Sequence, residues 1–281
     1  MPSSPMPTIA SQGASAALSA AFGSGWAMTH RILILGGTTE ARQLAERLAA
    51  RDDLAATVSL AGRVKAIVPH PVPIRVGGFG GAEGLAAYLA AEHVDLLVDA
   101  THPFADQISR NAVKAAAAAG VSMLALRRAP WAKAPGDRWQ EVDDISGAVA
   151  ALGLVRRRVF LALGRQEVAA FAPASTHFYL VRSIDPIEGR PLADAAYVEA
   201  RGPFEVGDER ALMEAHGIDT LVARNSGGLA GYGKIAAARA LGLPVVLIRP
   251  PALGAAPAVE SVDAAVEAID HPEAWATPRG E

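Results

Sequence analysis

The 281-residue sequence contains no cysteine, and no apolar run approaches the ~20 residues of a membrane-spanning helix. The absence of cysteine excludes disulfides, thiolate nucleophiles, iron–sulfur ligation and thiolate zinc sites, and it is compatible with a reducing cytoplasm. The formal net charge of −3 gives no sign of a nucleic-acid partner or an anionic membrane surface. We therefore expect a cytoplasmic protein that binds neither nucleic acid nor membrane.

Several catalytic signatures are also missing. The seven histidines include no pair spaced four residues apart and no carboxylate triad spacing, so we expect no metal site. The sequence has no Gly-x-Ser-x-Gly elbow, no Walker-type lysine after its first glycine turn, and no Tyr-x-x-x-Lys motif of short-chain dehydrogenases. Lysine occurs only four times, whereas alanine and arginine are frequent, a bias that GC-rich coding alone can produce.

Residues 1–28 consist mainly of small and apolar residues and carry no charge. A secretory signal needs a positive n-region and a continuous apolar core, and this segment has neither. We predict a disordered leader over 1–28, with Met28 as the natural start, and a short tail over 271–281.

The rest of the chain alternates short β-rich runs with helical runs rich in alanine and leucine. This rhythm predicts an α/β protein with parallel sheets and helices on both faces. Strands are expected at 31–35, 56–60, 73–76, 94–100, 121–126, 159–164, 177–182, 196–201, 219–224 and 243–248. Helices are expected at 39–50, 82–91, 106–119, 166–171, 208–216, 234–241 and 262–269.

The stretch RRAPWAKAPGDRW (127–139) interrupts this rhythm with prolines and a glycine, as is typical of an interdomain connection. The domain boundary is expected within 128–156. We predict two Rossmann-like parallel-sheet domains, over 29–140 and 141–270, with a cleft between them.

Glycine-rich turns follow several strands of the first half. In open parallel sheets ligands bind beyond the carboxyl ends of the strands, where glycine lets the backbone approach a ligand and present N–H groups. The adjacent Gly36 and Gly37 depart from the Gly-x-Gly-x-x-Gly fingerprint, and alone they also fit an ordinary strand–helix turn. Together the turns predict a nucleotide site. Its candidate cofactor-binding residues are Gly36, Gly37, Thr38, Thr39, Ser59, Gly62, Arg63, Gly77, Gly78 and Thr101.

The end of the second expected strand indicates which dinucleotide is bound. NAD-selective sheets usually place an acidic residue there for the ribose 2′-hydroxyl, whereas this chain offers Ser59 and then Arg63. A hydroxyl and a guanidinium suit a 2′-phosphate, so we predict NADPH as the cofactor.

Arginine follows strand after strand: Arg127, Arg165, Arg182, Arg201, Arg224 and Arg249. Because parallel strands end at a common edge, these guanidiniums could converge on one mouth and bind carboxylates bidentately. Coding bias and surface ion pairs are the alternative explanation. We predict Arg165, Arg182 and Arg201 as substrate-binding residues.

Two further turns carry polar groups to the same edge. The turn RNSGG (224–228) suits an anion, and it contributes Arg224, Asn225, Ser226 and Gly227. The turn THPF contributes His102, for which a purely structural role is the alternative, and Phe104. We predict that Phe104, Asn225, Ser226 and Gly227 bind substrate, that Arg224 and Lys234 are catalytic, and that His102 does both.

Taken together, these motifs resemble a known family. The segments ILILGGTTEARQLA, SLAGR, GGFGG, DATHPFA, LALGRQE, ARGPF, RNSGG and KIAAARALGLPVVLIRP occur in the order and spacing of the precorrin-6A reductases, over about 31–250. The chain differs from that family at Arg224, where the family has lysine; the positive charge is kept, but a planar fork replaces a point charge.

The resemblance implies two Rossmann-like domains with cofactor and macrocycle in the cleft between them. It implies hydride transfer from NADPH to one double bond of precorrin-6A, giving precorrin-6B in cobalamin biosynthesis, with neighbouring enzymes of that pathway as partners. A carboxylate-rich tetrapyrrole suits an arginine-lined mouth, and a nicotinamide makes a protein nucleophile unnecessary. The alternatives are an NADPH-sensing module without catalysis and a reductase of another polycarboxylate.

Overall fold

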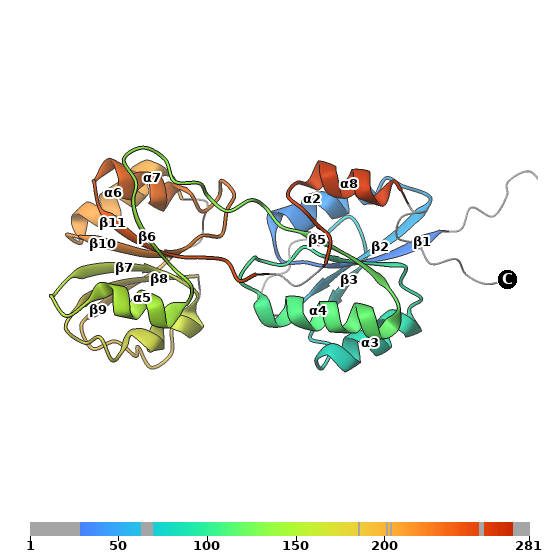
Figure 1. Ribbon diagram of the computed structural model, residues 1–281, viewed down its shortest axis with the longest axis horizontal. Coiled ribbons are helices and arrows are strands. Elements are labelled where there is room, and N and C mark those ends of the chain that lie inside the picture. Colours follow the sequence, from blue (N-terminus) through green and yellow to red (C-terminus); the bar gives the residue numbers. More distant parts are fainter. Residues whose placement is uncertain are drawn as a thin grey trace, which may run out of the picture.

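A computed structural model describes residues 29–62, 70–184, 186–200, 202, 204–252 and 256–271. Two six-stranded parallel sheets, each covered by helices on both faces, form two domains that lie side by side (Figure 1). The predicted fold class is confirmed. Among the described residues, no helix is both long and apolar enough to cross a lipid bilayer.

The first sheet has the strand order β12-β5-β4-β1-β2-β3. Its strands are β1 (His30–Leu35), β2 (Leu54–Leu60), β3 (Ile74–Val76), β4 (Leu96–Asp99), β5 (Ser122–Leu126) and β12 (Ala258–Val259). This is the 3-2-1-4-5-6 order of dinucleotide-binding sheets, with its topological switch point between β1 and β4. Leu35 of β1 is in register with Ser59 of β2 and Asp99 of β4, so the turns that follow these strands meet at one edge.

The second sheet has the order β6-β11-β10-β7-β8-β9 and repeats the same topology. Its strands are β6 (Arg138–Val142), β7 (Arg158–Ala162), β8 (Phe178–Ser183), β9 (Ala195–Glu199), β10 (Thr220–Arg224) and β11 (Pro244–Ile248). Its switch point lies between β7 and β10. The turn at Gly164 and the turn after Arg224 therefore lie next to each other.

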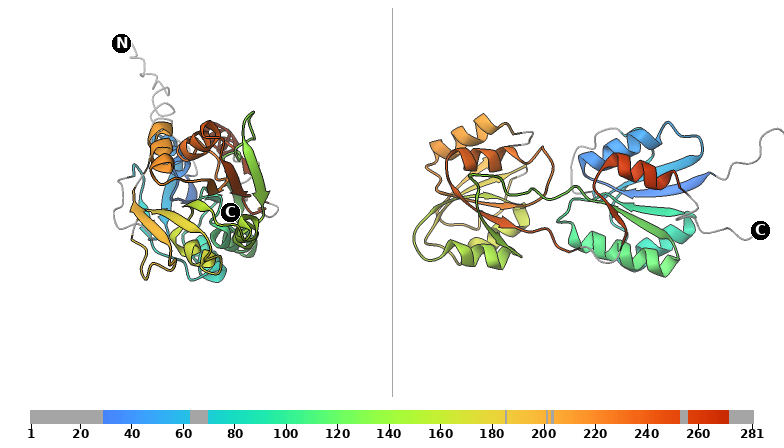
Figure 2. Two further views of the ribbon diagram at one scale, coloured as in Figure 1. Left: turned by 90° about the vertical axis from the view of Figure 1, so that its left-hand side faces the viewer. Right: turned by 45° about the horizontal axis from the view of Figure 1, so that its top comes forward.

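Each sheet takes its sixth strand from the segment that follows the other sheet's fifth strand. After β5 the chain crosses to the second sheet and adds β6, and after β11 it crosses back and adds β12. Figure 2 shows the two crossing segments, green and red, between the domains. The second domain is thus inserted between β5 and β12 of the first.

Helices cover both faces of each sheet. In the first domain α2 (Thr39–Leu48) and α8 (Val262–Ile269) pack on one face, and α3 (Ala82–Ala91) and α4 (Asp106–Ala119) on the other. In the second, α6 (Val206–Ala215) and α7 (Gly233–Ala240) lie opposite α5 (Ile145–Leu152) and the 3₁₀ helix η1 (Arg165–Phe171). Because helices bury the strands on both faces, the strands appear in the sequence as continuous apolar runs.

The structure corrects the predicted division at 140/141. Residues 256–270, which were predicted to belong to the second domain, carry β12 and α8 of the first. Strand β6 begins at Arg138, inside the range that was assigned to the first domain. Both corrections follow from the strand exchange, which local patterning does not reveal. The predicted leader over 1–28 and residues 272–281 of the predicted tail lie outside the described residues.

Candidate active site

A glycine-lined cavity of about 240 Å³ lies at the carboxyl edge of the first sheet. The turns after β1, β2, β3 and β4 all reach it. It is lined by Leu35, Gly36, Ser59, Ala61, Gly77, Gly78, Phe79, Gly80, Gly81, Leu85, Thr101, Ile108 and Asn111. The structure thus brings together five predicted cofactor residues, namely Gly36, Ser59, Gly77, Gly78 and Thr101.

The turn after β1 is built for close packing and for capping. A Cβ on Gly36 would lie 2.9 Å from Cγ1 of Val58, so only glycine lets the turn approach β2 this closely. The hydroxyl of Thr38 accepts a hydrogen bond from the Ala41 N–H (3.1 Å) and donates one to the Ala100 carbonyl (2.8 Å). Thr38 is therefore the N-cap of α2 and ties this turn to the turn after β4.

Two helices begin at the edge of this cavity. The first is α2, which starts at Thr39, three residues after Gly36, and the second is α3, which starts directly after Gly81. The N-terminus of a helix presents free N–H groups and the positive end of the helix dipole, which suits phosphate. Gly62 follows β2, whereas Arg63 lies outside the described residues, so its predicted contact with a 2′-phosphate stays a prediction.

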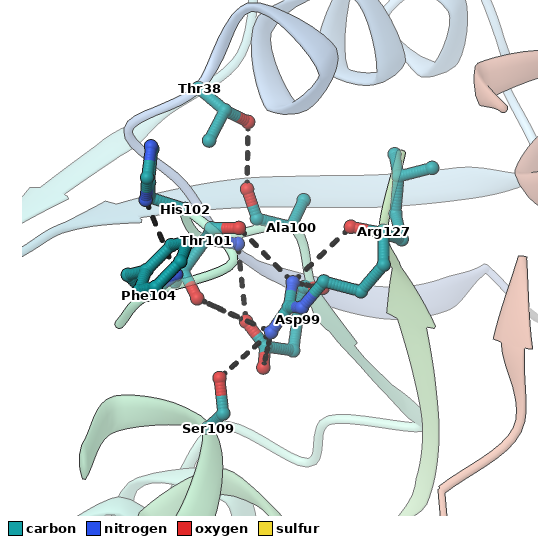
Figure 3. A network of polar contacts seen from close by, with 9 residues as sticks. Thr38, Asp99, Ala100, Thr101, His102, Phe104, Ser109 and Arg127 are labelled. Atoms are coloured by element: carbon teal, nitrogen blue, oxygen red, sulfur yellow. Dashed lines mark hydrogen bonds and ion pairs between the residues drawn. The ribbon is translucent and has the colours of Figure 1, made fainter. Parts of the chain in front are cut away.

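A buried ion pair supports the turn that carries His102 (Figure 3). Asp99 is fully buried, and its carboxylate accepts hydrogen bonds from the Thr101 N–H (3.1 Å) and hydroxyl (2.7 Å). It also pairs with Arg127, which donates in turn to the carbonyls of Asp99 (2.7 Å) and Thr101 (3.1 Å) and to the Ser109 hydroxyl (2.8 Å). Arg127 therefore holds the turn in place.

The THPF turn, which carries His102, borders two cavities. Thr101 lines the glycine-lined cavity, whereas Pro103 lines a second cavity of about 230 Å³ at the junction of the domains. That junction cavity is lined by Pro103, Arg127, Arg128, Ala129, Pro130, Asn225, Pro250, Pro251, Ala258 and Glu260. The THPF turn thus contributes one residue to the wall of each cavity.

The His102 ring has a fixed tautomer and is kept neutral. Its Nδ1 accepts a hydrogen bond from the Phe104 N–H (3.2 Å), which in a neutral ring leaves the proton on Nε2. Burial, together with three nearby guanidiniums, lowers the pKa of His102 from 6.5 to about 4. The guanidiniums belong to Arg128, Arg224 and Arg127. At neutral pH His102 is a hydrogen-bond donor and not an acid.

Arg224 reaches across the domain boundary. Its guanidinium pairs with Glu167 of η1 and lies 4.7 Å from the centroid of the Phe104 ring in the first domain. The other oxygen of Glu167 accepts a hydrogen bond from the Gly164 N–H (3.1 Å). The turns at the second switch point are thus joined to each other and to the THPF turn.

Carboxylates neutralise most of the six arginines that follow the strands. Four of the six arginines form ion pairs: Arg127 with Asp99, Arg182 with Glu209, Arg224 with Glu167, and Arg249 with Asp143. Arg165 also has an interaction partner, and Arg201 lies outside the described residues. The Arg182 pair is 9% and 2% exposed, so we assign Arg182 to the core rather than to substrate binding.

The RNSGG turn packs on the first interdomain crossing. The amide of Asn225 accepts from the Trp131 N–H (2.7 Å) and donates to the Trp131 carbonyl (3.0 Å), so both its ends are occupied within the fold. Gly227 has φ 64°, and a Cβ there would lie 2.2 Å from the Ala129 carbonyl oxygen. The Asn225 amide therefore fixes the interdomain crossing, although Asn225 also lines the junction cavity.

Lys234 lies in the first turn of α7, six residues after the RNSGG turn. Its Nζ donates to the Gly231 carbonyl (2.6 Å) and lies 5.2 Å from the Trp131 ring centroid. Burial lowers the pKa of Lys234 from 10.5 to about 8, although Glu209 opposes this shift. An ammonium with a pKa near neutrality can release its proton readily.

Several site residues were missed from the sequence. Glu40 pairs with Arg128 at the start of the interdomain crossing, Glu167 pairs with Arg224, and Trp131 lies beside Lys234. Their signals were weak, because an acidic residue in the first turn of a helix is common for reasons of helix stability alone. Arg128 was not predicted from the sequence, because its neighbour Arg127 is the arginine that directly follows strand β5.

Comparison with known proteins places this geometry in a family. Residues 31–270 match the family described as precorrin-6x reductase CbiJ/CobK. The chain belongs to this family. The resemblance predicted from the sequence motifs is thereby confirmed.

The precorrin-6x reductases that resemble the chain match it over most of their length. The precorrin-6A reductase of Sinorhizobium sp. is 52% identical over 249 residues, covering 88% of this chain and 94% of that protein. The precorrin-6A reductase of Rhodobacter capsulatus is 48% identical over 252 residues, covering 89% and 99%. A solved structure of CobK precorrin-6A reductase superimposes with a TM-score of 0.81 at 47% identity, covering 90% of this chain and all of that one.

Proposed function

We propose that this chain is an NADPH-dependent precorrin-6A reductase, which transfers a hydride to one double bond of precorrin-6A and gives precorrin-6B in cobalamin biosynthesis. Membership of the precorrin-6x reductase family supports the reaction. The observation that carries the site is the position of the THPF turn, whose Thr101 lines the glycine-lined cavity and whose Pro103 lines the junction cavity. This arrangement lets a dinucleotide in the first domain meet a macrocycle at the domain boundary.

The glycine-lined cavity fits a dinucleotide. Its wall offers backbone at Gly36, Gly77 and Gly78, and two helices begin beside it. The bound nicotinamide supplies the hydride. The chain's own task is to bind and orient both ligands and to exclude water between them.

Residues at the end of β2 favour NADPH over NADH. Residues 58–62, VSLAG, contain no carboxylate for a ribose 2′-hydroxyl, and Ser59 lines the cavity. Arg63 follows in the sequence and would add a guanidinium for the 2′-phosphate. The choice of NADPH rests on these residues together with the family resemblance.

The residues at the domain boundary would hold and protonate the macrocycle. His102, kept neutral, would donate from Nε2 to a substrate carboxylate, and Phe104 would pack against the ring. Reduction of a double bond by hydride also requires one proton. We assign that proton to Lys234, whose lowered pKa makes it a better acid than any arginine nearby. Arg165, Arg201, Ser226 and Gly227 stay proposed substrate-binding residues, and Arg224 orients Phe104 rather than moving a proton.

The test is a reaction of the purified chain with precorrin-6A and NADPH, followed by the absorbance of both compounds. We expect NADPH to be consumed in a one-to-one ratio with the tetrapyrrole, and only in its presence. NADPH binding without consumption would indicate a sensing module. Oxidation of NADPH by another polycarboxylate, but not by precorrin-6A, would indicate a different reductase. The cytoplasmic location and the association with neighbouring cobalamin-pathway enzymes stay proposals.

A further inference from the structure

Arg75 contacts the Gly77–Gly81 loop, part of which lines the glycine-lined cavity. It lies in β3 in register with Ser59 of β2, one residue before the end of the strand. Its Nη1 donates to the Gly77 carbonyl (2.6 Å) and its Nη2 to the Gly78 carbonyl (2.9 Å). One planar guanidinium thus holds two successive peptide groups of the loop.

Two aromatic rings fix the same guanidinium. Its Cζ lies 3.7 Å from the centroid of the Phe79 ring and 5.2 Å from that of Tyr88, and the two rings meet edge to face at 5.1 Å. Phe79 belongs to the loop and lines the cavity, whereas Tyr88 belongs to α3. The stacking therefore joins the loop, the sheet edge and the helix into one rigid unit.

The loop needs such support because glycine makes its backbone permissive. Gly77, Gly80 and Gly81 have φ values of 116°, 81° and 99°, and an unfolded chain samples many other conformations at these positions. On the helix side, a Cβ on Gly84 would lie 1.7 Å from the Phe79 carbonyl oxygen, so α3 packs directly under the loop. Arg75 and α3 hold the loop from two sides.

The orientation of these peptide groups matters for a ligand. In a trans peptide the carbonyl and the following N–H point in opposite directions. When the carbonyls of Gly77 and Gly78 point to Arg75, the N–H groups of Gly78 and Phe79 point away from it. Gly77, Gly78 and Phe79 line the cavity, and Arg75 is not among the described residues that do so. The N–H groups of Gly78 and Phe79 thus lie on the side of the loop opposite the Arg75 guanidinium.

We propose that Arg75 is a positioning residue that sets the Gly77–Gly81 loop so that its N–H groups bind the dinucleotide. This inference rests on the proposed function of the cavity. It predicts that Arg75 contributes to the binding of the part that NADPH and NADH share. A direct contact between Arg75 and the 2′-phosphate would instead affect NADPH alone.

The experiment measures dissociation constants for NADPH and NADH with the full chain, by nicotinamide fluorescence, for wild type, Arg75→Ala and Arg75→Lys. We expect Arg75→Ala to weaken both dinucleotides by a similar factor of about ten or more. Lysine can satisfy one carbonyl but not both, so Arg75→Lys should recover part of the loss. In turnover, the KM for NADPH should rise, while kcat and the KM for the tetrapyrrole change little.

Arg138→Ala is the matched control. Arg138 also lies in an edge strand and donates to a glycine carbonyl (Gly242, 2.8 Å), but it lies in the other sheet. This variant should bind both dinucleotides like wild type. Thermal unfolding of each variant identifies any that fail to fold, and Arg75→Lys then gives the decisive comparison.

Three results would overturn the inference. If wild type binds and Arg75→Ala binds both dinucleotides equally well, Arg75 does not position the loop. If Arg75→Ala loses NADPH alone, Arg75 contacts the 2′-phosphate directly. If wild type itself binds neither dinucleotide, the cofactor assignment under the proposed function fails as well.

Discussion

The guanidinium of Arg128, at the start of the first interdomain crossing, contacts both carboxylate oxygens of Glu40 in the first domain. Nη1 lies 3.0 Å from Oε1 and 3.1 Å from Oε2, and Nε donates to the Ser226 carbonyl at 2.6 Å. Glu40 lies in the first turn of α2, and Ser226 belongs to the RNSGG turn. The two side chains are only 19% and 22% exposed, so water screens this contact less than it screens a surface pair.

Loss of this contact should loosen the domains without unfolding them. We expect Arg128→Gln to lower kcat/KM for the tetrapyrrole by about ten-fold or more, because it breaks contacts to both domains. Glu40→Gln keeps the Arg128–Ser226 bond and should cost less. Steady-state kinetics and small-angle scattering check the two variants. Unchanged kcat/KM in Arg128→Gln would show that the contact does not set the position of the domains.

Arg63 should determine the choice between the two dinucleotides. We expect Arg63→Ala to weaken NADPH by about ten-fold or more and to leave NADH nearly unchanged, because only NADPH carries the 2′-phosphate. Isothermal titration with both dinucleotides measures the difference. Equal losses for NADPH and NADH would refute the contact with the 2′-phosphate.

Arg182 should matter for stability more than for substrate affinity. Its Nη1 lies 2.7 Å from Oε1 of Glu209, and its Cζ lies 3.6 Å from the Phe204 ring centroid. Arg182→Met leaves Glu209 buried without this partner, which we expect to cost about 3–5 kcal/mol in urea unfolding. The double variant Arg182→Met/Glu209→Leu removes both charges and should recover most of the loss. A raised KM with unchanged stability would instead restore the substrate role predicted from the sequence.

His102 should make the fold sensitive to acid. Its pKa is about 4 in the folded protein and 6.5 as an ordinary histidine, so between these values the unfolded chain takes up a proton first. Stability is therefore unaffected by this group above pH 6.5 and falls as the pH drops toward 4, by up to about 3 kcal/mol.

The variant His102→Asn should remove this part of the acid sensitivity. Its amide oxygen can still accept from the Phe104 N–H, but it does not titrate in this range. Urea unfolding at a series of pH values compares it with wild type and with a variant of the exposed His93, His93→Asn. Parallel stability profiles for wild type and His102→Asn would show that the histidine is not held neutral.

Lys234 should produce the basic limb of the pH–rate profile. Only the ammonium form donates a proton, so kcat should fall as the pH rises through about 8. Lys234→Arg keeps the charge but holds its proton too tightly, so we expect kcat to fall by about 10²- to 10⁴-fold and the limb near pH 8 to vanish. Lys114→Arg, on α4, serves as the control. A limb that persists in Lys234→Arg would assign the proton to another group.

Local patterns predicted most of the elements, because the signals lie within a few residues of one another. The helix that starts at Thr39 follows a glycine turn and an N-capping Thr38, and the structure begins α2 there. The same kind of signal was missed at Asp144, which caps α5, because the proline-rich stretch before it suggested a connection. Strand β6 was missed because its residues are largely exposed at a sheet edge, and β12 because it has two residues.

The meeting of the glycine turns at one edge could be predicted from the sequence, whereas the pairing of charges could not. A parallel sheet brings its strand ends to one edge whatever the details, so Gly36, Ser59, Gly77 and Thr101 meet as expected. The partner of each arginine depends on helices far away in the sequence: Arg224 meets Glu167, and Arg182 meets Glu209. Strand-end arginines alone cannot show whether such a partner exists.

The exchange of sixth strands sets an order of assembly on the ribosome. All six strands of the second sheet have been synthesised by Ile248, before β12 and α8 of the first sheet exist. Until α8 emerges, the face of α2 around Leu44 and Leu48 lacks its neighbours Ala265 and Ile269. The domain that is encoded first is therefore the last to be completed, and it can close its core only after the inserted domain has been made.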